Sequence, residues 1–556
     1  MTSEPHTSHA DGLTGLGVSP GRTAGPVYRM SPPPTLPADV PPVADPAGEV
    51  SAAAAALRFV ADELTRLSRQ VAGTASEVLD TEAMMAVDPT LADAVARRVD
   101  AGRPAAWAVT DAVAEQQEAF AAIGGYIAER AADLADVRDR AVARLLGLPM
   151  PGLPAPGEPY VLIAEDLSPA DTALLGPRVL AIVTRRGGPT SHTAILAKAR
   201  GLPAVVGCAG ILDLPDATPV SVDGTTGVVS VVAAAAVPEV REAAARDRAR
   251  LSSLTGPGRT ADGRPVPLLL NVGGVADVVA DAEGVGLFRT EFLFLDRTTA
   301  PTVDEQARAY AEVFAAVPGK IVLRTLDAGA DKPLPFLGLA TEDNPALGVR
   351  GLRVARDHPA VLADQLAAVA RAAAETGADV QVMAPMVATA AEAAEFAAAV
   401  RSAGLPVAGV MIEVPGAALR ARALLEAVDF VSIGTNDLSQ YTMAADRTNG
   451  ELAGLLDPWQ PAVLELVART ARAGAAAGKP VGVCGESAGD PLLALVYTGL
   501  GVTSLSMSGS VLPAVRASLA ARSFADCEYL ARLALDAPDA ATARRAVAGS
   551  VAGAAT

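Results

Sequence analysis

Apolar and polar positions along the chain follow two different periods. From about Glu49 to Leu148, apolar residues recur at helical spacing and proline is rare, with breaks at 88–89 and 102–104. This pattern predicts several packed helices. After a Pro/Gly-rich stretch at 149–159, short apolar runs alternate with helical pieces, which indicates a mixed α/β region.

Short apolar runs on both sides of the helical block predict one small α/β unit. We expect a turn and a short strand within 15–30. The other expected strands are 160–165, 178–184, 203–207 and 227–232. The helical block would then be an insertion in this unit. The charged segment 237–256 predicts a linker helix.

From Pro265 onward, eight apolar runs are separated by amphipathic helical segments. The runs are 266–272, 285–289, 321–325, 380–385, 407–413, 429–434, 481–484 and 503–508. Such alternation is typical of parallel βα units, and eight units predict a closed (β/α)₈ barrel. The connection 273–284 is short for a full helix, which puts the first helix of the barrel in doubt.

The predicted fold class is therefore α/β, with several regions along the chain. They are a disordered tail (1–14), an α/β domain (15–34 and 147–235), an inserted helical domain (35–146), a linker helix (236–260), a barrel (261–545) and a second tail (546–556).

Composition narrows the class of protein. Of the 556 residues, 51% are hydrophobic but only 3% aromatic, so the cores must be built from Ala, Val and Leu. The net charge of −18 argues against nucleic acid or an anionic membrane as partner. No apolar run is long enough to span a bilayer, and the N-terminus lacks a secretory pattern. Three cysteines are too few for a disulfide framework, so we expect a cytoplasmic protein.

Charged residues follow the predicted barrel strands where these strands end, and in such a barrel these ends carry the chemistry. Arg289, Arg324, Glu413 and the triplet 435–437 follow strands, and Arg447 lies in a loop. Any one of them alone is more often a helix cap or a surface charge. Together, two carboxylates and three arginines predict a divalent cation beside an anionic substrate.

The residue types suit that chemistry. Glu413 and Asp437 offer the hard oxygen ligands that Mg²⁺ takes. Arg289, Arg324 and Arg447 can each grip a phosphate or a carboxylate through two hydrogen bonds. Metal and arginines together would neutralise charge as a phosphoryl group leaves.

Cys484 lies in the glycine-rich stretch GVCGESAG. We expect its thiol to be exposed at a strand end, where it could carry a proton. The alternative, a small buried apolar residue, fits Cys208 and Cys527 better.

His192 is expected to begin an amphipathic helix in GGPTSHTAILAKARGLPAVVG (187–207). The hydroxyl residues around it are Thr190, Ser191 and Thr193. Hydroxyls and helix N-terminal amides stabilise an added phosphate, and Ser168 could support the site. A capping or core histidine is the other reading. His358 fits that reading, and His6 and His9 lie in the tail.

The stretch GGPTSHTAILAK resembles the phosphohistidine signature of the phosphoenolpyruvate-utilising enzymes. Further stretches resemble their phosphoenolpyruvate-binding barrel: GVGLFRTEFLFLDR, VLRTLDAGADKPLPF, NPALGVRGLR, GVMIEVPGA, DFVSIGTNDLSQYTMAADR and GVCGESAGD. The resemblance runs from about Gly15 to Leu535. It implies phosphoenolpyruvate as substrate and pyruvate as product.

The block before the histidine separates the branches of this family. It has no glycine-rich nucleotide loop, whereas pyruvate phosphate dikinase and phosphoenolpyruvate synthase carry an ATP-grasp domain there. Its segment YIAERAADLADVRDRAVARLL (126–146) resembles the helical insertion of enzyme I of the bacterial sugar phosphotransferase system. That resemblance implies the phosphocarrier protein HPr as partner and a homodimer formed through the barrel.

The resemblance also implies roles for individual residues. His192 would be phosphorylated, with Thr190 beside it and Ser168 where a threonine is more usual, while Pro189 stands where enzyme I often has an arginine. Arg289, Arg324, Arg447, Asn436 and Asp437 would bind phosphoenolpyruvate, Glu413 and Asp437 would bind Mg²⁺, Cys484 would protonate the pyruvate enolate, and Lys332 and Arg350 match further positions near the substrate.

Two other functions stay open at this point. One is a dikinase or synthase that works with a separate nucleotide-binding subunit. The other is a non-catalytic docking protein that senses phosphoenolpyruvate, although such a protein has no need of nucleophile, metal ligands and proton donor together. The HPr-contacting residues are not identified; Met84 and Met85 are candidates, but core packing is the favoured reading.

Overall fold

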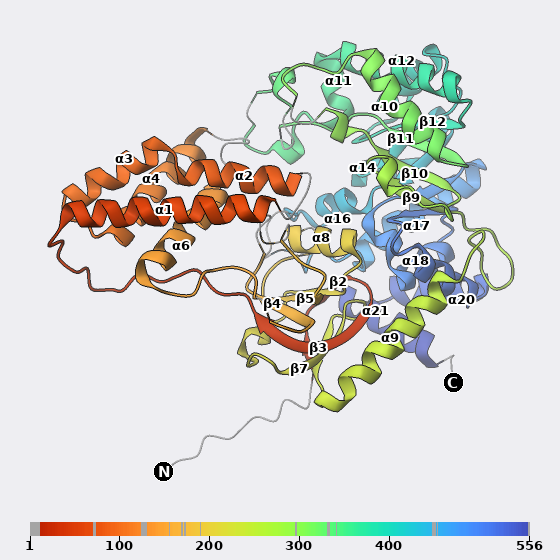
Figure 1. Ribbon diagram of the computed structural model, residues 1–556. Coiled ribbons are helices and arrows are strands. Elements are labelled where there is room, and N and C mark those ends of the chain that lie inside the picture. Colours follow the sequence, from red (N-terminus) through yellow and green to blue (C-terminus); the bar gives the residue numbers. More distant parts are fainter. Residues whose placement is uncertain are drawn as a thin grey trace. The chain divides into compact units, whose positions relative to one another are not determined.

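The computed structural model forms two compact units, residues 1–244 and 245–556 (Figure 1). It describes residues 12–69, 74–123, 131–154, 156–167, 171, 174–188, 191–294, 297–330, 334–340, 342–447, 452 and 454–553. Among these, no helix has both the length and the apolar content to cross a bilayer.

The predicted helical block is a bundle in the first unit. Its helices are α1 (Pro46–Ser68), α2 (Thr74–Ala86), α3 (Pro89–Asp100), α4 (Ala105–Ile123) and α6 (Ala131–Leu146). The predicted break at 88–89 is confirmed, since the Asp88 side chain accepts a hydrogen bond from the Thr90 amide and Pro89 opens α3. The prediction that Met84 packs in the core is wrong, because this residue is 65% exposed.

The first unit also holds an eight-stranded sheet in the order β1-β8-β7-β3-β4-β5-β6-β2. The strands are β1 (Leu13–Thr14), β2 (Leu16–Ser19), β3 (Arg22–Arg29), β4 (Tyr160–Ala164), β5 (Val179–Thr184), β6 (Ala204–Val206), β7 (Pro219–Asp223) and β8 (Val228–Val231). Strand β7 was not predicted. The single short strand expected within 15–30 is wrong: β2 pairs with β6, whereas β3 lies between β7 and β4.

Parts of both predicted tails belong to regular elements. Leu13 and Thr14 form β1 and pair with β8. At the other end, α21 (Ala540–Gly553) continues through most of the predicted tail, and its Val547 is fully buried in the barrel core. Strand pairing orders the first segment, and apolar packing orders the second.

The second unit is a closed parallel barrel in the order β9 to β16, so the predicted barrel is confirmed. Its strands are β9 (Leu268–Val272), β10 (Gly284–Arg289), β11 (Lys320–Arg324), β12 (Val380–Ala384), β13 (Ala408–Ile412), β14 (Phe430–Ile433), β15 (Val481–Val483) and β16 (Ser504–Met507). Between β9 and β10, residues 273–283 contain only the 3₁₀ turn η3 (Val275–Asp277), so the doubt about a first helix was justified.

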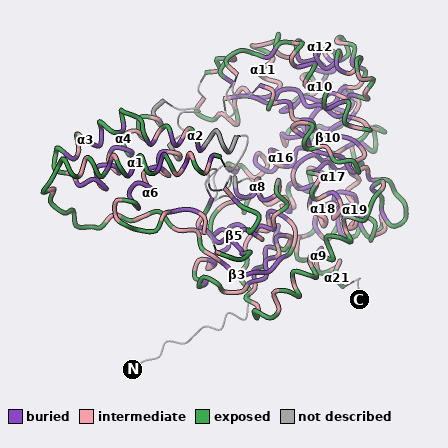
Figure 2. The backbone as a smooth tube through the Cα atoms, viewed as in Figure 1, coloured by how far each residue is buried: buried purple, intermediate pink, exposed green. Residues whose placement is uncertain are grey.

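Helices surround the barrel and most of them pack apolar residues into its core; buried and exposed positions alternate along them (Figure 2). They are α10 (Val303–Ala316), α11 (Val354–Asp357), α12 (Pro359–Thr376), α13 (Ala390–Ser402), α14 (Pro415–Leu419), α15 (Ala421–Ala427), α16 (Thr435–Met443), α17 (Pro461–Ala477), α18 (Pro491–Gly499), α19 (Leu512–Ala520) and α20 (Phe524–Leu535), followed by α21. The predicted linker helix is α9 (Val237–Ser252).

Candidate active site

The residues expected at the barrel rim lie at the carboxyl ends of their strands. Arg289 ends β10, Arg324 ends β11 and Glu413 directly follows β13. Asp437 lies in the first turn of α16, which follows β14. Because all strands of the barrel are parallel, these ends share one rim, where substrates of such barrels bind.

Arg324 is held by two acidic residues that the sequence analysis did not single out. Its guanidinium lies 3.1 Å from Glu291 Oε1 and 3.2 Å from Asp327 Oδ2. Burial alone disfavours the charged form of Arg324, but Glu291 and Asp327 outweigh it and raise the pKa above its ordinary value. Both acidic residues could have been found from the sequence, because they lie within the stretches that resemble the phosphoenolpyruvate-binding barrel.

Arg289 differs from Arg324 in its surroundings. Its partly buried side chain forms no ion pair or hydrogen bond with a residue that the structure describes. The Nε atom of Arg324 is also buried without a partner there. The rim therefore offers cationic N–H groups that an anionic substrate can satisfy.

Arg350 organises the rim from within the protein. It is only 1% exposed and donates paired hydrogen bonds to Asp327 (3.1 and 3.1 Å) and to Asp437 (3.2 and 3.3 Å). A further bond of 3.4 Å goes to the Tyr441 hydroxyl. All five N–H donors of Arg350 are thus engaged, and Arg350 holds the Asp437 carboxylate in place. The sequence analysis did not predict this orienting role of Arg350.

Glu413 and Asp437 fit a small divalent cation. Both are buried, and Glu413 Oε2 accepts a hydrogen bond of 2.9 Å from the Met386 amide. Burial, followed by the charges of Asp437 and Asp327, raises the pKa of Glu413, and a bound cation would relieve this repulsion.

The number of protein ligands also matters. Within the described ranges, no group of three or more His, Cys, Asp or Glu residues is placed to hold a metal. Two carboxylates with the rest of the shell from substrate and water is the arrangement Mg²⁺ favours. Arg447 Nη1 lies 3.5 Å from Asp437 Oδ1, at the same place.

Cys484 is buried, which corrects the expectation of an exposed thiol. It follows β15 directly and is 2% exposed, because its side chain joins the apolar barrel interior with Met383 and Met411. Burial raises the pKa of the Cys484 thiol to about 11, and the thiol donates a hydrogen bond of 3.7 Å to the Ile433 carbonyl oxygen. The thiol is therefore protonated at neutral pH, the form a proton donor needs.

Asn436 is fixed by the loop after β15. Its Oδ1 accepts a hydrogen bond of 3.2 Å from the Glu486 amide. The neighbouring Thr435 hydroxyl shares a hydrogen bond of 2.7 Å with Ser487. These bonds tie the start of α16 to the loop that carries Cys484.

His192 is the first residue of α8 (His192–Arg200) in the first unit, as expected. The Ser191 side chain caps this helix by accepting a hydrogen bond of 3.3 Å from the Ala194 amide. The Thr193 hydroxyl donates to Asp166 at 3.2 Å. An anion is stabilised at such a helix N-terminus.

Several of the predicted site residues cannot be placed. Ser168, Pro189, Thr190 and Lys332 lie outside the described residues, and of His192 only the backbone is described.

Comparison with known proteins adds to this geometry. Three family models match: the N-terminal domain of phosphoenolpyruvate-utilising enzymes over 14–130, their mobile domain over 156–227 and their phosphoenolpyruvate-binding domain over 248–524. A phosphoenolpyruvate-protein phosphotransferase of Streptomyces coelicolor is 53% identical, covering 97% of this chain and 99% of the relative. This chain belongs to the phosphoenolpyruvate-protein phosphotransferase (enzyme I) family.

Other relatives in this family agree. The phosphoenolpyruvate-protein phosphotransferase of Haloferax volcanii is 42% identical over 85% of this chain and 86% of its own length. That of Staphylococcus carnosus is 38% identical over 91% of this chain and 93% of its own length. The resemblance to enzyme I inferred from the sequence is thereby confirmed.

Proposed function

We propose that this chain transfers the phosphoryl group of phosphoenolpyruvate to its own His192 and then to a histidine of HPr, releasing pyruvate. The observation that carries this proposal is the rim of the barrel, where Arg289, Arg324, Glu413 and Asp437 meet at one end. A trianionic substrate needs such a cationic site, and membership of the enzyme I family supports the same reaction.

The rim residues divide the work of binding. Arg289 and Arg324 direct N–H groups to the phosphate and carboxylate oxygens, with Arg447 and Asn436 assisting. Glu413 and Asp437 would hold Mg²⁺, which supplies charge neutralisation at the phosphoryl group when bound. Glu291 and Asp327 fix Arg324, so little ordering is left for the moment of binding.

The proposed reaction is a displacement at phosphorus followed by protonation of the enolate. A ring nitrogen of His192 attacks phosphorus in line, the bond between phosphorus and the enolate oxygen breaks, and the enolate leaves. The enolate carbon then takes the proton of the Cys484 thiol and becomes the methyl group of pyruvate. The attacking nitrogen must be unprotonated, so the other ring nitrogen carries the proton.

The full cycle requires the two units to come together for the transfer to His192 and to part for the transfer to HPr. HPr would dock on the helical bundle, and the exposed Met84 is an apolar contact available to it. Segment 237–256 is the swivel we propose. We place the reaction in the cytoplasm and expect a dimer formed through the barrel.

The test is incubation of the purified chain with labelled phosphoenolpyruvate and Mg²⁺. His192→Ala should abolish labelling, whereas His358→Ala, a matched substitution at another helix start, should retain it. Label passing to added HPr would support the second transfer. Labelling of His192→Ala at another residue would refute the assignment, and labelling by ATP alone would favour a dikinase-like enzyme.

A further inference from the structure

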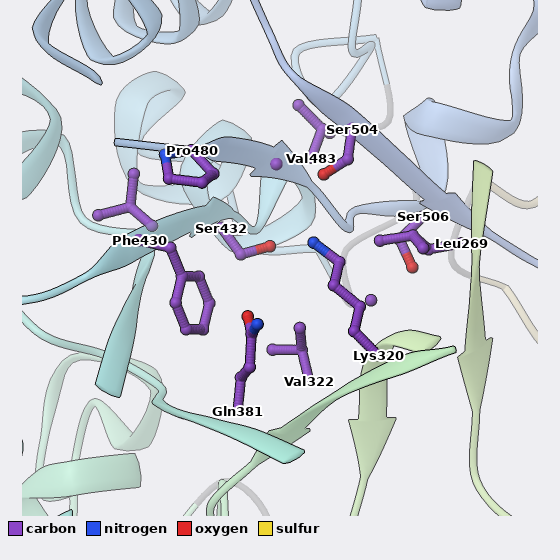
Figure 3. Close-up of a pocket in the computed structure, with 13 residues that line it drawn as sticks. Leu269, Lys320, Val322, Gln381, Phe430, Ser432, Pro480, Val483, Ser504 and Ser506 are labelled. Atoms are coloured by element: carbon purple, nitrogen blue, oxygen red, sulfur yellow. The ribbon is translucent and has the colours of Figure 1, made fainter. Parts of the chain in front are cut away.

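A second polar cavity lies at the opposite end of the barrel from the rim. Lys320, Phe430 and Ser504 are the first residues of β11, β14 and β16, and all three line it. It contains about 370 Å³ of space between atoms, part of it open to solvent. The remaining polar side chains that line it are Gln381, Ser432 and Ser506, as Figure 3 shows.

Two glycines keep this cavity open. A Cβ atom added at Gly286 would lie 2.6 Å from the Ser506 hydroxyl, and one at Gly482 would lie 3.0 Å from the Ser504 hydroxyl. Glycine weakens a strand interior and often marks a place where something approaches the backbone closely. The two positions therefore preserve polar space inside a barrel that side chains otherwise fill.

Lys320 brings a positive charge to this space. The chain has only four lysines among its 45 basic residues, so a compact ammonium in place of a guanidinium is unusual here. Its amine points toward Ser432 (Figure 3) and forms no ion pair or hydrogen bond with any described residue. Burial lowers the pKa of Lys320, and Asp379 only partly opposes this.

Asp379 attracts the Lys320 ammonium, but two other acidic residues at this end of the barrel are already engaged elsewhere. Glu283 Oε1 accepts hydrogen bonds of 2.8 Å from the amides of Gly258 and Leu268. Asp429 is paired with Arg401 at 3.0 Å. A partly desolvated ammonium among hydroxyl and amide groups is stabilised most by a small anion that touches it directly.

We propose that this cavity is a second binding site of the protein, for a small oxyanion such as inorganic phosphate or a short carboxylate. Lys320 is the counter-charge, and Gln381, Ser432 and Ser504 donate hydrogen bonds to the oxygens. The carbonyl oxygen of Ile433, the residue after Ser432, accepts a hydrogen bond of 3.7 Å from the Cys484 thiol, so β14 links the cavity to the proposed proton donor. Binding here does not depend on the phosphotransfer proposed above.

Lysine-selective ¹³C and ¹⁵N labelling of the full chain tests this directly, because four lysines give few signals. Inorganic phosphate, acetate and, for ionic strength, sodium chloride are added in separate titrations, and Lys320→Met assigns the Lys320 signal. We expect phosphate or acetate, but not chloride, to shift the Lys320 signal and to raise its pKa. The response to the two oxyanions tells which ligand is preferred.

The other lysines are internal controls. Lys332 matches a position near phosphoenolpyruvate, so a phosphate response at Lys332 without one at Lys320 means binding at the rim only, which would overturn the cavity site. In that case the proposed reaction would stand. Conversely, if labelled phosphoenolpyruvate did not label His192, the proposed reaction would fail, but the response of the Lys320 signal to phosphate would not change.

A second reporter keeps the test independent of Lys320 itself. Val322 lines the cavity, and its labelled methyl signals can be followed in both Lys320→Met and Ser504→Ala. We expect the phosphate affinity to fall at least tenfold in Lys320→Met and less in Ser504→Ala. Equal affinity in Lys320→Met and the wild type would overturn the role of Lys320.

Discussion

Replacing Arg350 with methionine should destabilise the barrel strongly. The substitution removes paired hydrogen bonds to both Asp327 and Asp437, and Asp327 has no exposed surface. Arg324 still neutralises part of its charge from 3.2 Å. Asp437 loses the group that orients it, so phosphoenolpyruvate binding should weaken as well.

The magnitude follows from the burial of the network. Breaking a buried ion pair by removing one partner costs about 3–5 kcal/mol, because a buried charge is left uncompensated. With a urea dependence of about 3 kcal/mol per molar, the unfolding midpoint of the barrel should fall by about 1 M or more.

The two tryptophans make this measurable unit by unit. Trp459 is fully buried in the barrel and Trp107 lies in the helical bundle, so Trp107→Phe leaves a single fluorescent reporter of barrel unfolding. Urea titrations are compared with and without Arg350→Met in that background. The reporter is needed because a chain of several domains does not unfold as one two-state system.

A surface arginine provides the control. Arg356 pairs with Glu392 at 2.8 Å but its side chain is 64% exposed, so Arg356→Met should cost about 1 kcal/mol or less. A loss of under 1 kcal/mol for Arg350→Met, equal to that of Arg356→Met, would refute the view that Arg350 supports the rim electrostatically.

Three further outcomes are expected. Burial raises the pKa of Glu82 to about 9, so the folded bundle keeps this proton at pH values where the unfolded chain releases it. The stability of the bundle should therefore decline from about pH 4 to pH 9. Glu82→Gln should flatten this pH dependence and add about 1–3 kcal/mol at pH 8, as measured by the fluorescence of Trp107 during unfolding. With its pKa near 11, Cys484 should be alkylated by iodoacetamide at pH 8 slowly in native protein and quickly in urea, and modification within minutes of the native thiol would contradict its burial. A Cβ at Gly485 would lie 1.8 Å from the side chain of the first residue of α16. Gly485→Ala should therefore raise the KM for phosphoenolpyruvate and lower the stability of the barrel by about 1–3 kcal/mol. Gly416→Ala, whose added Cβ would meet no atom within 4 Å, should leave the KM and the stability unchanged.

Much of the fold could be predicted because its signals are local. Asp88 and Pro89 end one helix and begin the next through contacts within three residues. The eight barrel strands follow from short apolar runs, and the rule that parallel strands end on one rim gave the places of Arg289, Arg324 and Glu413. The sequence could not divide 15–30 correctly, because β2 and β3 pair with strands about 190 residues away.

The sequence by itself determined the class of barrel, the candidate rim residues and the enzyme I resemblance, since periodicity, strand ends and motifs are all written along the chain. Only the tertiary structure decided what surrounds those residues. It buried Cys484 by turning its side chain into the barrel interior, and it joined Arg350 to Asp327 and Asp437 across 23 and 87 residues. It also gathered Lys320 with the hydroxyls of β14 and β16. Such contacts depend on register and side-chain direction, which arise when strands distant in sequence pack together.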